Sequence, residues 1–77
     1  MTAQLIVRYS DFDATAYETD SENRSNSGLT QLQAWREGPS SRWVLFEIRD
    51  RERAQAWLDK GAALGHAPDE HHFLETT

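Results

Sequence analysis

Residues 29–49, LTQLQAWREGPSSRWVLFEIR, decide how this chain folds. The run 42–49 is rich in apolar residues, and Gly38-Pro39-Ser40-Ser41 separates it from the run 29–37. Proline suits the second position of a type I turn, and a turn between two strand-like runs is typical of a β-hairpin. The stretch therefore predicts two antiparallel strands joined by a turn at 38–41.

The expected pairing across this hairpin leaves both of its faces apolar. A turn centred within 38–41 pairs Glu37 with Arg42 and Trp35 with Val44. One face then collects Val44, Phe46 and Ile48, and the other collects Leu32, Ala34, Arg36, Trp43, Leu45 and Glu47. Strands that are buried on one side only alternate more cleanly than these do. We therefore expect a second copy to cover the spare face, sheet against sheet, in a homodimer.

The segment before the hairpin predicts a strand followed by a helix. Residues 5–9, LIVRY, are rich in β-branched and aromatic types, which favour a strand. Residues 12–24 begin with helical spacing but then turn polar, so they predict a short or frayed helix that ends by Gly28. Asp11 and Asp13 lie beside its start, where helix capping explains them without any chemistry.

The segment after the hairpin completes the order β-α-β-β-α-β. Asp50 is suited to cap a helix over 51–60 or slightly beyond, and EHHFLE at 70–75 is short enough to be a final strand. This order predicts a single α+β, ferredoxin-like domain over residues 1–77, with two helices on one face of a four-stranded antiparallel sheet. The residues expected under the helices are Leu5, Val7, Val44, Phe46 and Ile48.

Size and composition favour reinforcement of the core by self-association. The chain has 77 residues, 38% of them hydrophobic, which is typical of one small globular domain. Such a domain buries only about 60% of the surface that its unfolded chain exposes. Because the chain has no cysteine, disulfides and thiolate zinc sites are excluded. Oligomerisation is the remaining common source of stability.

Charge and hydropathy exclude other classes of partner. The formal net charge of −5 repels phosphate backbones and anionic lipids, so we expect no nucleic acid and no membrane partner. No run approaches the roughly 18 apolar residues of a membrane span, and the first residues lack the pattern of a signal peptide. A cytoplasmic location is the expectation that follows.

Several short motifs resemble those of a known superfamily. They are Asp11-Phe12-Asp13, Arg24 with Gly28, Trp43 to Glu47 before Asp50, Ala54 to Leu58, and Phe73-Leu74-Glu75. With these the chain resembles the dimeric α/β-barrel superfamily, which includes the antibiotic-biosynthesis monooxygenase-like domains, and above all its small uncharacterised bacterial members. The resemblance implies a homodimeric α/β barrel. Such proteins usually carry a histidine in the first helix, where this chain has Asp20 to Asn23, so no site residue is carried over.

Five residues are candidates for binding a ligand on the face away from the helices. They are Arg8, Arg36, Trp43, Glu47 and His72. Guanidinium groups can orient an anion and an indole can stack on a ring, so a small aromatic anion is the implied ligand. The competing interpretation is that these aromatic and charged groups form core or interface, and it is the favoured one. Arg8 and Glu47 are expected to form a half-buried ion pair of structural role.

The histidines do not predict a metal centre. His71 and His72 are adjacent on a strand, so their side chains point to opposite faces and cannot easily share one ion. His66 and Glu70 add ligand types but no recognisable spacing. We expect no metal and no cofactor. A single histidine, best His72, could still serve as an acid or base.

Two hypotheses for function remain open. A non-catalytic small-molecule-binding or interaction dimer is favoured, because no nucleophile, phosphate loop or paired acidic motif stands in a recognisable setting. The alternative is a cofactor-independent monooxygenase or isomerase that acts on a small aromatic compound. The superfamily resemblance and the five candidate residues support that alternative.

Overall fold

The computed structural model of the chain describes residues 2–77. The elements in chain order are β1 (Ala3–Tyr9), α1 (Ala14–Thr19), α2 (Ser21–Asn26), β2 (Leu29–Glu37), β3 (Ser41–Ile48), α3 (Arg51–Ala63) and β4 (Glu70–Glu75). The α+β class and the β-α-β-β-α-β order are confirmed, with the first helical segment divided into two short helices. The hairpin, the second predicted helix and the final strand all lie where the sequence predicts them.

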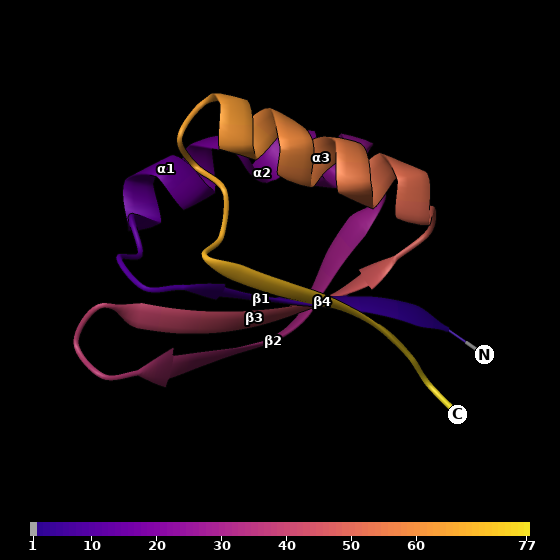
Figure 1. Ribbon diagram of the computed structural model, residues 1–77, viewed down its shortest axis with the longest axis horizontal. Helices are drawn as coiled ribbons and strands as arrows, with labels where there is room; N and C mark the ends of the chain where they lie inside the picture. The colour runs from indigo at the N-terminus through magenta and orange to yellow at the C-terminus, as the bar shows by residue number, and fades with distance from the viewer. Residues whose placement is uncertain (1) are drawn as a thin grey trace.

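The four strands form one antiparallel sheet in the order β2-β3-β1-β4. Figure 1 shows the helices on one side of this sheet and, within residues 2–77, no element on the other. This arrangement is consistent with a ferredoxin-like fold. The sheet therefore has a covered face and a face that this chain leaves open.

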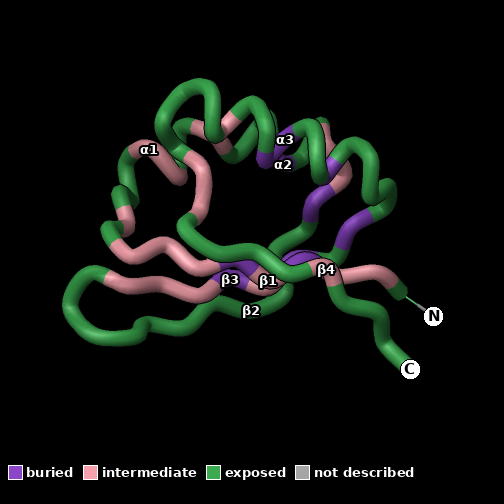
Figure 2. Tube along the Cα trace, in the orientation of Figure 1, coloured by how far each residue is buried: buried purple, intermediate pink, exposed green. Residues whose placement is uncertain are grey.

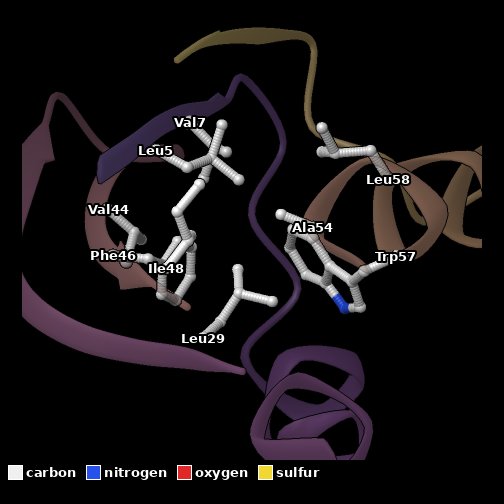
Figure 3. Close-up of a cluster of buried hydrophobic side chains, with 9 residues drawn as sticks. All are labelled: Leu5, Val7, Leu29, Val44, Phe46, Ile48, Ala54, Trp57 and Leu58. Atoms are coloured by element: carbon white, nitrogen blue, oxygen red, sulfur yellow. The ribbon is translucent and has the colours of Figure 1, made fainter. Parts of the chain in front are cut away.

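The hydrophobic core lies between the covered face and the helices (Figure 2). Its buried members are Leu5, Val7, Leu29, Val44, Phe46, Ile48, Ala54, Trp57 and Leu58. All five residues expected under the helices are among them. Figure 3 shows Trp57 and its neighbours on α3 pointing toward the strands, and the rings of Trp57 and Phe46 meet edge to face at 5.8 Å.

The first helical segment is divided at Asp20, which is held by a contact with α3 as well as by contacts within the segment. Asp13 caps α1 by accepting a hydrogen bond from the backbone N–H of Ala16 at 3.1 Å, as expected of a cap. At the junction, the Asp20 carboxylate accepts the indole N–H of Trp57 from α3 at 2.8 Å. The Asp20 backbone N–H still donates to Ala16 at 3.1 Å, so the chain bends without losing that bond. A residue of α3 thus anchors the bend.

The predicted pairing across the hairpin was wrong by one residue at the turn. Glu37 lies opposite Ser41 and Trp35 opposite Trp43, rather than opposite Arg42 and Val44. The turn has only three residues, and Gly38 takes a left-handed backbone conformation at φ +77° that glycine accommodates without a side-chain clash. Nearer the other end of the hairpin, a second shift occurs between Gln31 and Gln33, the mark of a β-bulge.

Candidate functional site

The register of the sheet arranges the open face in cross-strand rows. Residues that lie opposite one another on neighbouring strands point to the same face. One row reads Gln33, Leu45, Ile6, His72; the next reads Trp35, Trp43, Arg8, Glu70; a third reads Thr30, Glu47, Gln4, Leu74. Leu45 and Ile6 lie at the middle of the face and are half-buried, whereas Trp35 and Leu74 are 43% and 45% exposed. An apolar band therefore crosses a face that the chain itself does not cover.

The structure brings only part of the predicted ligand set together. Arg8 and Trp43 are cross-strand neighbours, and the Arg8 guanidinium lies 6.0 Å from the Trp43 ring centroid. His72 lies in the adjoining row, whereas Glu47 belongs to the row beyond it. Arg36 lies opposite Arg42, on the face of Val44, so its predicted place beside Trp43 was wrong. The misplaced turn is the cause, since a slip of one residue moves a side chain to the other face.

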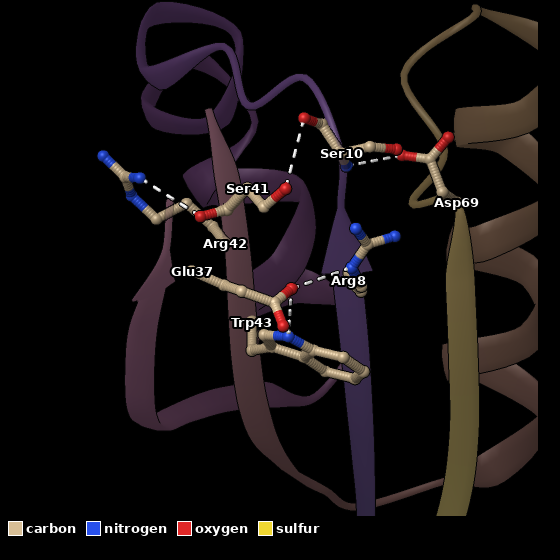
Figure 4. Close-up of polar contacts among 7 residues, drawn as sticks. All are labelled: Arg8, Ser10, Glu37, Ser41, Arg42, Trp43 and Asp69. Atoms are coloured by element: carbon tan, nitrogen blue, oxygen red, sulfur yellow. Dashed lines mark hydrogen bonds and ion pairs between the residues drawn. The ribbon is translucent and has the colours of Figure 1, made fainter. Parts of the chain in front are cut away.

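Arg8 forms an ion pair, but not with the predicted partner. Its Nε donates to Glu37 Oε1 at 3.1 Å, and the Trp43 indole N–H donates to the same oxygen at 3.0 Å (Figure 4). Glu47 lies opposite Gln4, four positions along β1 from Arg8. The predicted pair of Arg8 and Glu47 was therefore wrong. The observed network ties the end of the hairpin to β1 and engages the Nε–H of Arg8 and the indole N–H of Trp43, two of the predicted ligand residues.

The Glu37 carboxylate provides a direct test of this network. Hydrogen bonds from Trp43 and then Arg8 lower the pKa of Glu37 below its ordinary value. We expect Trp43→Phe to raise the pKa of Glu37 toward that ordinary value, as measured by a carboxyl NMR titration. Trp35→Phe is the matched control, because Trp35 makes no hydrogen bond to Glu37 within the described chain. An unchanged pKa in Trp43→Phe would contradict the network.

The sign of the linked effect on stability follows from the lowered pKa of Glu37. Because its folded-state pKa lies below the unfolded value, protonation of Glu37 opposes folding. Its stabilising contribution is present above the ordinary pKa and is lost as the pH falls through the folded-state pKa. The side chain is exposed, so we expect this contribution to be small.

The histidine side chains lie apart, as their adjacency on β4 predicts. His71 is opposite Val7 on the covered face, and His72 is opposite Ile6 on the open face. Across residues 2–77, no three His, Asp or Glu side chains come close enough together to hold a metal ion. No described helix is both long and apolar enough to cross a membrane.

A cavity of about 500 Å³ lies on the covered side of the sheet, at the end where α1 faces the C-terminal end of α3 and the loop that follows it. Tyr9 at the end of β1 lines it from the sheet, Tyr17 from α1, and Trp57 and Leu58 from α3. The loop after α3 contributes Leu64 to Asp69. None of the five predicted ligand residues lines this cavity, although all five lie in the described chain.

Aromatic rings form one wall of this cavity. Tyr9, Phe12 and Tyr17 make a cluster in which ring centroids lie 5.3 to 6.2 Å apart. Burial raises the pKa of the Tyr9 phenol far above its ordinary value, and the neighbouring Tyr17 adds to the effect. The Tyr9 hydroxyl makes no hydrogen bond to the described residues and is not sealed within the core. With its pKa raised, the phenol is uncharged at neutral pH.

The buried charged residue of the lining, Arg24, is already paired. Arg24 is 9% exposed, stacks over the Tyr17 ring at 3.6 Å and donates to the Tyr17 carbonyl oxygen at 2.6 Å. It also lies 3.7 Å from Asp20, which accepts the Trp57 indole N–H. These contacts join α1, α2 and α3 around one side of the cavity. They stabilise its wall.

Sequence reasoning missed this cavity because its lining comes from segments far apart in the chain. Residues 9–24 meet residues 57–69, and no local motif marks the meeting. The one available signal was the concentration of aromatic residues at 9, 12 and 17, next to several aspartates. No family model, curated protein or solved structure matches this chain.

Proposed function

We propose that the chain is a non-catalytic small-molecule-binding module that works as a homodimer. The observation that carries the binding proposal is the cavity between Tyr9, α1 and α3. Its volume of about 500 Å³ falls within the range of small-molecule sites, and its walls combine aromatic and aliphatic side chains with a few polar groups.

The polar groups of the cavity favour binding over catalysis. Asp13 caps a helix, Asp20 accepts from Trp57, and Asp69 accepts the Ser10 backbone N–H at 2.7 Å. The raised pKa of the Tyr9 phenol disfavours its use as a base at neutral pH. The lining is thus suited to holding and orienting a molecule, because most of its carboxylates already accept hydrogen bonds from within the chain.

A titration with 2-phenylethanol, a small neutral aromatic probe, tests the binding site. We expect millimolar binding that shifts the NMR signals of Ala16, Gly61 and the Trp57 indole N–H, all at the cavity wall. Ala16→Leu fills the cavity and should abolish these shifts. Leu64→Trp is a second blocking variant at a position that is 62% exposed, which spares the core. Shifts at Trp43 and Leu45 instead, or shifts that survive both variants, would overturn the placement.

The open face of the sheet supports the homodimer. Its four strands have six to nine residues each, so at about 3.4 Å per residue and 4.8 Å between strands the face measures roughly 25 by 20 Å. A standard interface takes about 800 Å² of accessible surface from each partner, which the protruding side chains of such a face can supply. The apolar band through Ile6, Leu45 and Trp43 favours a second copy as the occupant.

Two such faces in contact would form the barrel that the resemblance to the dimeric α/β-barrel superfamily implies. The Arg8–Glu37 pair balances its own charges, so it can enter an interface without an unpaired partner. We expect light scattering at micromolar concentration to give twice the mass of one chain. A cooperatively folded monomer at all such concentrations would contradict the dimer and leave the cavity proposal standing.

A further inference from the structure

We infer that the ligand of the cavity is a small aromatic amine, bound as its ammonium ion with the charge at the rim formed by Asp11 and Asp69. This inference rests on the proposed function, because it names the ligand class for the same site. It also reverses the sign of the charge expected from the sequence, which implied an aromatic anion on the open face.

The formal charges of the cavity lining favour a cation. Its charged side chains other than histidine are Asp11, Asp13, Asp20 and Asp69 against Arg24 and Lys60. The chain as a whole carries a net charge of −5, so its summed field also attracts cations. The charge of the lining and the net charge of the chain would both repel an anionic ligand.

The buried cation of the cavity is not available to an anion. The Arg24 guanidinium lies on the Tyr17 ring, donates to the Tyr17 carbonyl oxygen and faces the Asp20 carboxylate. Recruiting it to a ligand would break contacts that hold α1 to α2. Lys60 is the remaining cation of the lining, and it is exposed. It is one cation against the carboxylates of Asp11 and Asp69, which are exposed as well.

Asp11 and Asp69 are exposed carboxylates of the lining, and they come from two distant parts of the chain that a contact at Ser10 joins. The Ser10 backbone N–H donates to Asp69 Oδ2 at 2.7 Å, and the Asp69 backbone N–H donates to the Arg8 carbonyl oxygen at 2.8 Å. Asp11 follows Ser10 directly and also lines the cavity. The hydrogen bonds from Ser10 lower the pKa of Asp69 below its ordinary value, so this carboxylate stays charged at neutral pH.

The interior of the cavity suits the aromatic part of the ligand. Phe12, Trp57, Leu58 and Pro68 contribute apolar surface to the lining. A ring that lies inward among these side chains leaves the charged end of the ligand toward the exposed carboxylates of Asp11 and Asp69. The ring of such a ligand would be buried against the aromatic side chains, and its ammonium group would form a charge-assisted hydrogen bond with a carboxylate at the rim.

Three probes of matched size separate the ligand class from the cavity itself. They are phenethylamine, neutral 2-phenylethanol and anionic 3-phenylpropionate, each titrated into the full chain at pH 7 and followed by the cavity signals. We expect phenethylamine to bind about two- to fivefold more tightly than the alcohol for each carboxylate it engages. The propionate should bind most weakly, and added salt should reduce the preference for the amine.

Charge-removing variants locate the rim. Asp69→Asn and Asp11→Asn should each weaken phenethylamine binding by about two- to fivefold and leave the alcohol unchanged. Glu47→Gln is the matched control, because it removes the same charge from the open face. Equal binding of all three probes, or an equal loss of affinity in Glu47→Gln, would contradict an amine as the ligand class. The cavity would still be the proposed binding site. Failure of every probe to shift the cavity signals would overturn the proposed binding function itself.

Discussion

Phe46→Ala is expected to remove most of the stability of this protein. Phe46 is completely buried at the centre of the covered face, where its ring packs against Trp57. Truncation of a core phenylalanine costs about 3–5 kcal/mol, since the lost burial and the cavity left behind both count. A domain of this size has a total free energy of unfolding of roughly 4–12 kcal/mol. We therefore expect the variant to be largely unfolded well below the melting temperature of the parent chain.

Thermal and denaturant unfolding, followed by circular dichroism, measure this effect. A loss of 3 kcal/mol lowers Tm by more than about 12 °C in a domain of this length. Leu64→Ala is the control, because Leu64 is 62% exposed and its truncation should change the free energy of unfolding by under about 0.5 kcal/mol. Similar small changes in Tm in both variants would contradict a central role for Phe46 in the core.

Leu45→Lys is expected to separate the proposed dimer into folded monomers. Leu45 lies in the central row of the open face beside Ile6, so a lysine there would lie within the proposed interface. Burial of an unpaired ammonium costs several kcal/mol, and each dimer would contain two of them. We expect Kd to rise by at least about a hundredfold, which corresponds to roughly 3 kcal/mol. In the monomer the lysine can reach solvent, so the fold should persist.

Sedimentation over a range of micromolar concentrations measures this shift, with circular dichroism as the check on folding. Leu64→Lys places the same new charge on the helix side and should leave the mass unchanged. A dimer that persists in Leu45→Lys but dissociates in Leu64→Lys would place the interface on the helices. The cavity titrations should give the same result in the Leu45→Lys monomer, because the lining comes from one chain.

The covered face was predictable because its signals are local. Alternation in β1 and β3 places Leu5, Val7, Val44 and Phe46 on one side of their strands, and a period of two needs no knowledge of the partner strand. The cap at Asp50 was predictable for the same reason, since a cap acts within one helical turn; its carboxylate accepts the Glu52 backbone N–H at 2.9 Å.

The pairing across the hairpin was only partly predictable. The existence of the hairpin follows from the turn residues, but its register depends on whether the loop has two, three or four residues. Here the left-handed Gly38 closes a three-residue loop, and a bulge near Gln31 shifts the pairing again. Those two backbone details decide that Arg36 lies away from Trp43, and that Glu37 instead of Glu47 neutralises Arg8.

The sequence by itself determined the α+β class, the order of elements, the core face and the helix caps, because each depends on periodicity or on contacts within a few residues. Only the tertiary structure decided the bend at Asp20, where a Trp57 indole from α3 supplies the anchoring hydrogen bond. It also decided the candidate site. The lining of the cavity comes from residues 9–24 and residues 57–69, which the hydrogen bond from Ser10 to Asp69 helps to join. Contacts between segments so far apart leave no periodic or local pattern in the chain, so packing alone brings them together.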